Sequence, residues 1–435
     1  MYELKRILIL GAARSGIAAA KILASNNDVT ISDLKDLKKE DQDLLESLGV
    51  KVIITDDQCS LISNDYDLIV KNPAIMATSD ITKKIEHLGI PCINEMELAY
   101  HYLPEYLTII GVTGSNGKTT TVTMIYNLLK LHGYKVILGG NIGTPLCDLL
   151  SDISSNDILL LEISDHQLYD FHDFKTNISV LTNLYHTHLD YHGTYENYIN
   201  TKKKIFNNHT NKDIAIINYS NSDSMNLTGD ISSTKIYFNN DLNYIKDNFL
   251  YLDNKKYLNL DNMLLKGLHN YENLLAALLV VKLFKLDKEK VEEFIKTFRG
   301  VEHRIEYVKT IDGVDYYNDS KSTNPTSTIT ALKTFNRPIH LILGGLNRNQ
   351  DFNELKDYLG NVKMIYAIGE VTDIVVNFAK SLDIPAFKCY NMESAMKKIK
   401  ENVEFGDIVL LSPGSSSQDQ YKKFEDRGDE FKKLI

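Results

Sequence analysis

The chain has 435 residues, enough for two to four domains with several hydrophobic cores. Its net charge of −10 argues against a nucleic-acid-binding surface, and its 43% hydrophobic content is ordinary for a globular protein. The four cysteines show no C-x-x-C spacing, and no apolar run reaches the roughly 18 residues of a membrane-spanning helix. These features predict a soluble, cytoplasmic protein that has neither nucleic acid nor a membrane as its partner.

The first block, residues 1–94, opens with a predicted strand at 6–10, a glycine-bearing turn at 11–16 and a helix. The next strand ends at Asp33, near the place where dinucleotide-binding domains carry an acidic ribose ligand. The middle glycine of that fingerprint is replaced by Ala13, which disfavours close approach to a pyrophosphate. A related phosphate-bearing ligand is therefore a better prediction than NAD or FAD. A plain strand–turn–helix unit is the alternative.

The second block, residues 95–300, holds a glycine-rich loop between a buried strand at 107–110 and a helical segment at 119–131. Strand, glycine-rich loop, Lys-Thr and helix form the context of a phosphate-binding loop. The glycines permit tight turns, so that backbone N–H groups can point at phosphate oxygens. Lys118 can then reach the β- and γ-phosphates, and the Thr119 hydroxyl can ligate Mg²⁺. The predicted ATP contacts of this loop are Gly114, Ser115, Asn116, Gly117, Lys118, Thr119 and Thr120.

Two further strands of this block end in side chains that suit phosphate chemistry. One ends at Glu162, a carboxylate typical of the second-strand Mg²⁺ partner in phosphate-loop enzymes. After the other, at 178–181, His186, His188 and His192 follow with H-x-H-x-x-x-H spacing, which is compatible with zinc. Because an ATP loop is already present, Mg²⁺ together with a substrate contact is the preferred interpretation.

The rest of the chain predicts more strands. Residues 221–260 are polar and tyrosine-rich, which indicates short strands or loops. The third block, residues 301–435, has predicted strands at 338–343, 364–368 and 407–411. Each is followed by Gly or Pro, and ligands of such sheets bind beyond the carboxyl ends of the strands. The alternation of strands and helices predicts an α/β fold with parallel sheets.

Together these motifs resemble those of the Mur ligases over nearly the whole length. The stretches that carry the resemblance are residues 111–121, 140–145, 162–168, 187–190, 269–273, 302–306, 318–324 and 411–414. The Asp-Ser-Lys-x-Thr-Asn element at 319–324 is similar to that of the members that add D-glutamate. The Asp-Asn-Pro-Arg motif of the diaminopimelate-adding members is absent from the sequence.

The resemblance implies three domains. They are a Rossmann-like UDP-substrate-binding domain at 1–94, a phosphate-loop ATPase domain at 95–300, and a Rossmann-like amino-acid-binding domain at 301–435. It also implies a monomer that uses ATP, two Mg²⁺ ions, UDP-MurNAc-L-Ala and D-glutamate. Amide formation would pass through an acyl phosphate.

The resemblance further implies a role for individual residues. Catalysis is implied for Lys118, His188 and Lys202, and metal ligation for Thr119, Glu162, His188 and Lys202, the last as a carbamate. Further ATP contacts are implied at Asn270, Asn273, Arg304 and Asp319. The UDP-substrate end matches Arg14, Ser15, Asp33, Lys35, Asn141 and His188. The D-glutamate end matches Lys321, Thr323, Arg348, Ser417 and Phe424. The neighbouring Lys203 and Lys204 are predicted to be solvated charges.

Three stretches depart from the family pattern. The family commonly reads Ser-Ser-Phe-Gln where this chain has Ser-Asp-His-Gln at 164–167, and Arg348 stands where the family has a lysine. Residues 72–74 read Asn-Pro-Ala in place of Ser-Pro-Gly. The alternatives are a folylpolyglutamate synthetase or another Mur ligase and, from another class, a regulatory phosphate-loop NTPase. The latter needs neither the 319–324 element nor the first block.

Overall fold

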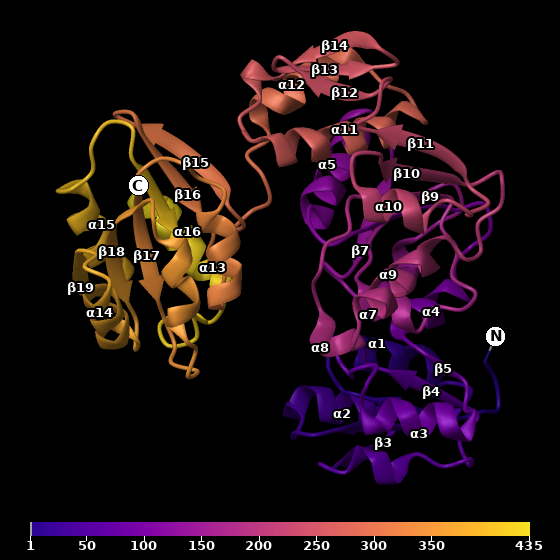
Figure 1. The fold of residues 1–435 in the computed structure, drawn as a ribbon. Coiled ribbons are helices and arrows are strands. Elements are labelled where there is room, and N and C mark those ends of the chain that lie inside the picture. The colour runs from indigo at the N-terminus through magenta and orange to yellow at the C-terminus, as the bar shows by residue number, and fades with distance from the viewer. Residues whose placement is uncertain (1) are drawn as a thin grey trace. The chain divides into compact units, whose positions relative to one another are not determined.

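The computed structural model of the protein describes residues 2–435, which form two compact units (Figure 1). Unit 1 comprises Met1–Asp261 and Leu268–Glu292, and unit 2 comprises Asn262–Gly267 and Glu293–Ile435. Across residues 2–435, no helix combines the length and the apolar character that crossing a membrane requires.

The first sheet of unit 1 has five parallel strands in the order β3-β2-β1-β4-β5. Ile7 and Ile9 pack into one core cluster and Leu8 and Leu10 into another, so both faces of β1 are covered. This explains the unbroken apolar run and confirms the strand predicted at 6–10. The elements are β1 (Arg6–Leu10), α1 (Arg14–Leu23), β2 (Asp28–Asp33), α2 (Lys39–Ser47), β3 (Lys51–Ile54), η1 (Gln58–Leu61), β4 (Leu68–Lys71), α3 (Asp80–Leu88) and β5 (Cys92–Ile93).

The second sheet has six parallel strands in the order β11-β10-β9-β6-β8-β7. Its strands are β6 (Thr108–Thr113), β7 (Val136–Gly140), β8 (Ile158–Glu162), β9 (Ile178–Leu181), β10 (Ile214–Asn218) and β11 (Thr234–Phe238). They confirm the strands predicted at 107–110, 158–162 and 178–181. Because β6 lies between β9 and β8, the segments that follow these three strands emerge side by side at one edge of the sheet.

The helical segments of residues 95–297 precede, connect and follow these strands. They are α4 (Glu95–Tyr100), α5 (Lys118–Leu131), α6 (Leu146–Leu149), η2 (Leu150–Asp152), α7 (Asp165–Tyr169), α8 (Leu189–His192), α9 (Tyr195–Lys203), η3 (Lys204–Phe206), α10 (Ser222–Leu227), α11 (Leu268–Lys282) and α12 (Lys288–Thr297). The apolar run of α11 is buried, and this helix packs against α5.

Within residues 221–260, residues 244–259 form an antiparallel sheet of β12 (Tyr244–Lys246), β13 (Phe249–Leu252) and β14 (Lys255–Asn259), followed by η4 (Leu260–Asn262). The predicted short strands are thus confirmed. The helix α10 was not predicted. It begins because the side chain of Asn221 accepts a hydrogen bond from the N–H of Ser224 and caps it.

Unit 2 is built on a six-stranded sheet in the order β15-β16-β20-β17-β18-β19, in which only β15 and β16 pair antiparallel. The predicted strands at 338–343, 364–368 and 407–411 are confirmed as β17, β18 and β20. The elements are β15 (Glu306–Ile311), β16 (Val314–Asn318), α13 (Pro325–Leu332), β17 (Ile339–Gly344), η5 (Phe352–Tyr358), β18 (Val362–Ile368), α14 (Thr372–Ser381), β19 (Ala386–Tyr390), α15 (Met392–Lys400), β20 (Ile408–Leu411) and α16 (Phe424–Leu434).

Candidate functional site

The glycine-rich loop joins β6 to α5, and two of its positions require glycine. Gly114 and Gly117 have φ angles of +146° and +81°. A Cβ at Gly114 would lie 2.0 Å from Oγ1 of Thr182, and one at Gly117 would lie 2.4 Å from Oδ1 of Asn273. The backbone therefore lies tightly against its supports, and α5 begins at Lys118, where a helix N-terminus favours anions.

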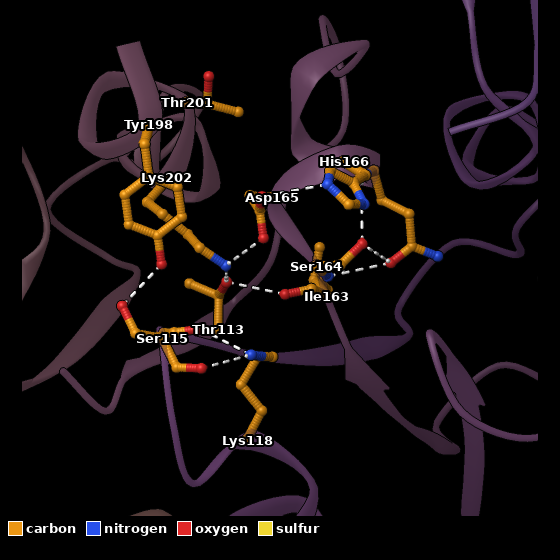
Figure 2. A network of polar contacts seen from close by, with 12 residues as sticks. Thr113, Ser115, Lys118, Ile163, Ser164, Asp165, His166, Tyr198, Thr201 and Lys202 are labelled. Carbon is orange, nitrogen blue, oxygen red and sulfur yellow. Dashed lines mark hydrogen bonds and ion pairs between the residues drawn. The ribbon is translucent and has the colours of Figure 1, made fainter. Parts of the chain in front are cut away.

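Two other segments of the chain support the loop. The N–H of Ser115 donates to the carbonyl of Asn183 over 2.9 Å, and its hydroxyl lies 2.7 Å from that of Tyr198 (Figure 2). The ammonium of Lys118 donates to the carbonyls of Gly114 and Ser115 over 2.8 and 3.0 Å. Asn183 and Tyr198 were not predicted. The signal for the first was available, because a polar residue directly after a buried strand emerges at the ligand edge of the sheet.

Lys202, on α9, lies fully buried between β6 and α7 (Figure 2). Its ammonium donates to the hydroxyl of Thr113 over 3.0 Å and lies 3.3 Å from Oδ1 of Asp165. Burial, aided by repulsion from Lys118, lowers the pKa of Lys202 to about 7, although the charges of Asp165 and Glu162 act in the opposite direction. A lysine with this pKa is largely a neutral amine just above neutral pH, and a neutral amine is nucleophilic.

Two histidines adjoin Asp165. Its Oδ2 lies 2.8 Å from Nε2 of His192, which is fully buried, and 3.6 Å from Nε2 of His166. Burial raises the pKa of Asp165, but the hydrogen bond from His192 and the charge of Lys202 outweigh it and hold this pKa below its usual range. Burial is also the main cause that lowers the pKa of His166.

The histidine grouping inferred from the H-x-H-x-x-x-H spacing is wrong. His186 is exposed and stacks on Tyr195 at a ring distance of 3.7 Å, while His192 turns inward to Asp165. His188 lies 5.3 Å from His166, ring to ring. The spacing failed because α8 is a single turn whose first and last residues face different surroundings, and Asp165 comes from a segment distant in sequence.

The prediction that Lys204 is a solvated charge is also wrong. Its side chain is half-buried and its ammonium donates to the carbonyl of Tyr169, over whose ring it also lies. Burial lowers the pKa of Lys204. Lys203, by contrast, makes a partly exposed ion pair with Asp230 at 2.7 Å. A run of like charges read from sequence does not say which member turns into the core.

Glu162 ends β8 with one carboxylate oxygen held and the other free. Oε1 accepts a hydrogen bond of 2.7 Å from the side-chain amide of Asn141, and the buried Oε2 has no hydrogen-bond partner among residues 2–435. The adjoining Gly143 carbonyl accepts from Nη2 of Arg14 over 3.0 Å. Asn141 and Gly143 thereby connect the carboxylate to the first block. An unpartnered, buried carboxylate oxygen suits a hard dication such as Mg²⁺.

In the first block, Asp33 holds the turn after β1 in place. Its Oδ2 accepts from the N–H of Ala12 over 2.6 Å, and its Oδ1 accepts from the N–H groups of Leu34 and Lys35. Ser15 is half-buried, and Lys35 is exposed. The predicted acidic residue therefore has a structural task in the turn itself.

In unit 2, Asp319 is buried after β16 and accepts hydrogen bonds from three groups. These are the hydroxyls of Ser322 and Ser412, at 2.5 and 2.7 Å, and the N–H of Ile305 at 3.2 Å. Burial raises the pKa of Asp319 to about 6, and the hydrogen bonds lower it only in part. Arg304, predicted as an ATP contact with it, is exposed in the same unit, whereas the buried Asn270 and Asn273 belong to unit 1.

Arg427 of α16 organises the predicted D-glutamate end and was missed. Its side chain is buried, and its guanidinium donates to the carbonyls of Ser320 and Ser415 over 2.9 and 3.1 Å. The hydroxyl of Ser320 in turn donates to the carbonyl of Phe424. A signal was present, since an arginine between the apolar Phe424 and Phe431 falls on the buried face of an amphipathic helix.

The remaining predicted residues of this end differ in exposure. Arg348 and Thr323 are exposed, and Ser417 is buried. Nη2 of Arg348 donates to Oε1 of Gln418 over 2.6 Å, so the loop after β17 contacts the segment that carries Ser417. Lys321 lies in the turn between β16 and α13, and its N–H donates to the carbonyl of His303.

The fold and the loop geometry define an α/β phosphate-loop nucleotide-binding protein. Residues 112–281 match the Mur ligase middle domain, and residues 303–414 match the Mur ligase glutamate ligase domain. A UDP-N-acetylmuramoylalanine–D-glutamate ligase of Geobacillus sp. is 40% identical over 99% of this chain and 97% of its own. One of Lactococcus lactis subsp. lactis is 39% identical with the same coverage. This chain belongs to the Mur ligase family, whose members are ATP-dependent enzymes that form amide bonds.

Solved structures support the fold. The UDP-N-acetylmuramate–alanine ligase of Thermotoga maritima matches with a TM-score of 0.58 and 18% identity over 98% of both chains. The MurF ligase of the same organism, solved with ADP, matches with a TM-score of 0.53 and 19% identity over 100% of this chain and 99% of that one. The predicted α/β fold class with parallel sheets is thereby confirmed.

Proposed function

We propose that this enzyme joins D-glutamate to UDP-MurNAc-L-Ala at the expense of ATP, in cytoplasmic synthesis of peptidoglycan precursors. One observation carries the choice of substrates: relatives named for this reaction match 99% of the chain at about 40% identity. The match therefore includes the first block and the 319–324 element, which a folylpolyglutamate synthetase or a regulatory NTPase does not need.

The chemistry has two steps. The substrate carboxylate attacks the γ-phosphate of ATP, so that a C–O–P acyl phosphate forms and ADP leaves. The amine of D-glutamate then attacks the acyl carbon, loses a proton and expels inorganic phosphate from a tetrahedral intermediate. A carboxylate is a poor electrophile, and phosphorylation supplies its leaving group. Lys118 and the N–H groups of its loop would hold the β- and γ-phosphates and offset their charge.

The residues for two Mg²⁺ ions are Thr119, Glu162, His188 and the carbamate of Lys202. The unpartnered Oε2 of Glu162 is the observation that fits an oxygen-seeking dication. When bound, Mg²⁺ supplies charge neutralisation at the transferred phosphoryl group. The chain's own contribution is to fix Glu162 through the amide of Asn141.

Lys202 supports the carbamate proposal through its surroundings. A buried amine with a pKa near 7 presents a lone pair to CO₂; an N–C bond forms and one proton leaves. The product is an anion where a cation had been. Asp165, which pairs with the ammonium form, also has a hydrogen bond to His192 that does not involve Lys202.

We assign the substrate ends to the three proposed domains. The domain at 1–94 would hold the uridine nucleotide with Arg14, Ser15, Asp33 and Lys35, and Asn141 of the 95–300 domain would lie beside the substrate. The domain at 301–435 would bind D-glutamate with Lys321, Thr323, Arg348, Ser417 and Phe424. Calorimetry on the full chain should detect UDP-MurNAc-L-Ala and no useful affinity for NAD or FAD.

The decisive experiment is mass analysis of products made from UDP-MurNAc-L-Ala, ATP and a panel of D- and L-amino acids. We expect one product, with D-glutamate, and ATP turnover that requires both co-substrates. A product with L-lysine or diaminopimelate would assign another Mur reaction. ATP turnover without either co-substrate would favour a regulatory NTPase.

A further inference from the structure

A group of metal-binding side chains lies beside Lys202 and has no place in the proposed reaction. Asp165 and His166 come from α7 and His192 from α8. One ligand atom of each lies within 4.8 Å of the others. The side chains of Asp165 and His192 are almost completely buried, whereas 31% of the His166 side chain is exposed, so the core fixes two of the three members.

The contacts within the group leave one potential metal-ligand atom without a hydrogen-bond partner among residues 2–435. Asp165 directs Oδ1 to Lys202 and Oδ2 to His192. The Nε2 atom of His166 is buried 3.6 Å from the same Oδ2 and has no hydrogen-bond partner among residues 2–435. A buried ring nitrogen without a partner is costly unless something binds it, because it has left water and gained nothing in return.

The distances suit a tetrahedral ion. Ligand atoms bonded to zinc at about 2.0–2.1 Å lie about 3.3 Å apart in tetrahedral geometry. The Oδ2 to Nε2 distances are 3.6 Å for His166 and 2.8 Å for His192, so the first needs almost no change and the second a shift of about half an ångström. Two imidazoles and one carboxylate form a donor set preferred by zinc-like dications, whereas Mg²⁺ prefers oxygen ligands.

We propose that Asp165, His166 and His192 bind a zinc-like divalent cation, with Oδ2 and the two Nε2 atoms as ligands and one position left for water. The site uses none of the proposed Mg²⁺ ligands and goes beyond the ligase reaction, although it adjoins two of them: Oδ1 of Asp165 lies 3.3 Å from the ammonium of Lys202, and the ring of His166 lies 5.3 Å from that of His188. While Lys202 is an ammonium, Oδ1 of Asp165 keeps its ion pair with it. Nδ1 of His192 has no hydrogen-bonding partner within residues 2–435 to orient the ring, so binding is weaker than in structural zinc sites.

Co²⁺ is the probe, since its visible absorption reports four-coordinate nitrogen and oxygen ligation. The full chain is titrated with Co²⁺ in saturating Mg²⁺ and without substrates, and bound metal is counted by equilibrium dialysis. We expect one Mg²⁺-resistant Co²⁺ per chain. His166→Gln and His192→Gln should each weaken it by more than the roughly 10- to 100-fold that loss of an outer-shell partner costs.

His186→Gln is the matched control, because His186 lies in the same loop but stacks on Tyr195 away from the cluster. It should bind Co²⁺ as the wild type does. Thermal melting without metal identifies any variant that does not fold. If a histidine variant does not fold, Co²⁺ binding is measured on the near-isosteric Asp165→Asn instead, which should also weaken it. Absence of Mg²⁺-resistant Co²⁺ in the wild type, or equal loss in His186→Gln, overturns the proposal. Neither result depends on which amino acid the enzyme ligates.

Discussion

Lys202 in unit 1 and Asp319 in unit 2 are both buried ionisable groups, and burial disfavours the charged form of each. Their surroundings differ in how many polar atoms find hydrogen-bond partners. Around Lys202, Oε2 of Glu162 and Nε2 of His166 are buried and find no hydrogen-bond partner in the described part of the chain, residues 2–435. Around Asp319, three donors from its own unit saturate the carboxylate. Burial shifts both pKa values toward neutrality, to about 7 and about 6. The unsaturated pocket is suited to receiving ligands, and the saturated one to holding a loop in shape.

The largest expected effect tests whether the region around Lys202 and the phosphate loop binds ligands. Lys118→Ala should lower the rate of amide formation by at least about 10³-fold, because it removes a positioned charge at the β- and γ-phosphates. The rate is measured as product formed at saturating ATP, and circular dichroism should show an unchanged fold. Near-normal turnover would remove the phosphate-loop assignment.

The second largest effect is expected for Lys202→Ala, which should lower the rate of amide formation by about 10²- to 10³-fold. Stripping CO₂ should lower wild-type activity, and a small carboxylic acid should partly restore the variant by occupying the place of the carbamate. Because the pKa of Lys202 is lowered to about 7, carbamylation should increase as the pH rises through 7. Steady-state rates with and without bicarbonate measure this.

Lys203→Ala is the matched control, since its partly exposed ion pair with Asp230 is worth little. It should keep nearly full activity. Wild-type activity in Lys202→Ala would instead mean that the metal needs no ligand at this position.

Arg348→Ala should raise the KM for D-glutamate by some 30- to 150-fold, the equivalent of about 2–3 kcal/mol for a charge-assisted pair. The KM for ATP should hardly change, and Arg348→Lys should recover part of the loss. Initial rates at varied D-glutamate test this. A shift in the KM for ATP, or no shift, would place the amino-acid site elsewhere.

The smallest expected effect concerns the pH dependence of folding stability, and it tests the structural role of the buried Asp319. The pKa of Asp319 is raised from 3.8 to about 6, so between about pH 4 and pH 6 the folded state holds a proton that the unfolded state has lost. This group's contribution to stability is therefore present at low pH and falls as the pH rises through 6.

Asp319→Asn cannot titrate, so its stability relative to the wild type should increase across that interval by on the order of 1 kcal/mol per pH unit. Urea unfolding from pH 4 to pH 7, followed in parallel for both proteins, measures the difference. A constant difference would mean that the carboxyl titrates alike in the folded and unfolded states.

The sequence alone predicted the strands and the phosphate loop well, because those signals are local. An apolar run such as β1 is fixed by burial on both faces, and the loop glycines by steric contact with neighbouring segments. Prediction from the sequence failed where the environment of a side chain depends on segments distant in the chain. Lys204 turns into the core, His192 turns to Asp165, and Arg427 is buried beneath two loops of unit 2.

What the sequence determined by itself is therefore the α/β class, the phosphate loop and the family, since contiguous residues carry each of them. Tertiary structure decided the electrostatics of the pocket. Lys202 follows Asp165 by 37 positions and Thr113 by 89, and only the order of β9, β6 and β8 brings them together. A pKa near 7 requires exclusion of water by residues from several elements, which no single stretch of sequence specifies.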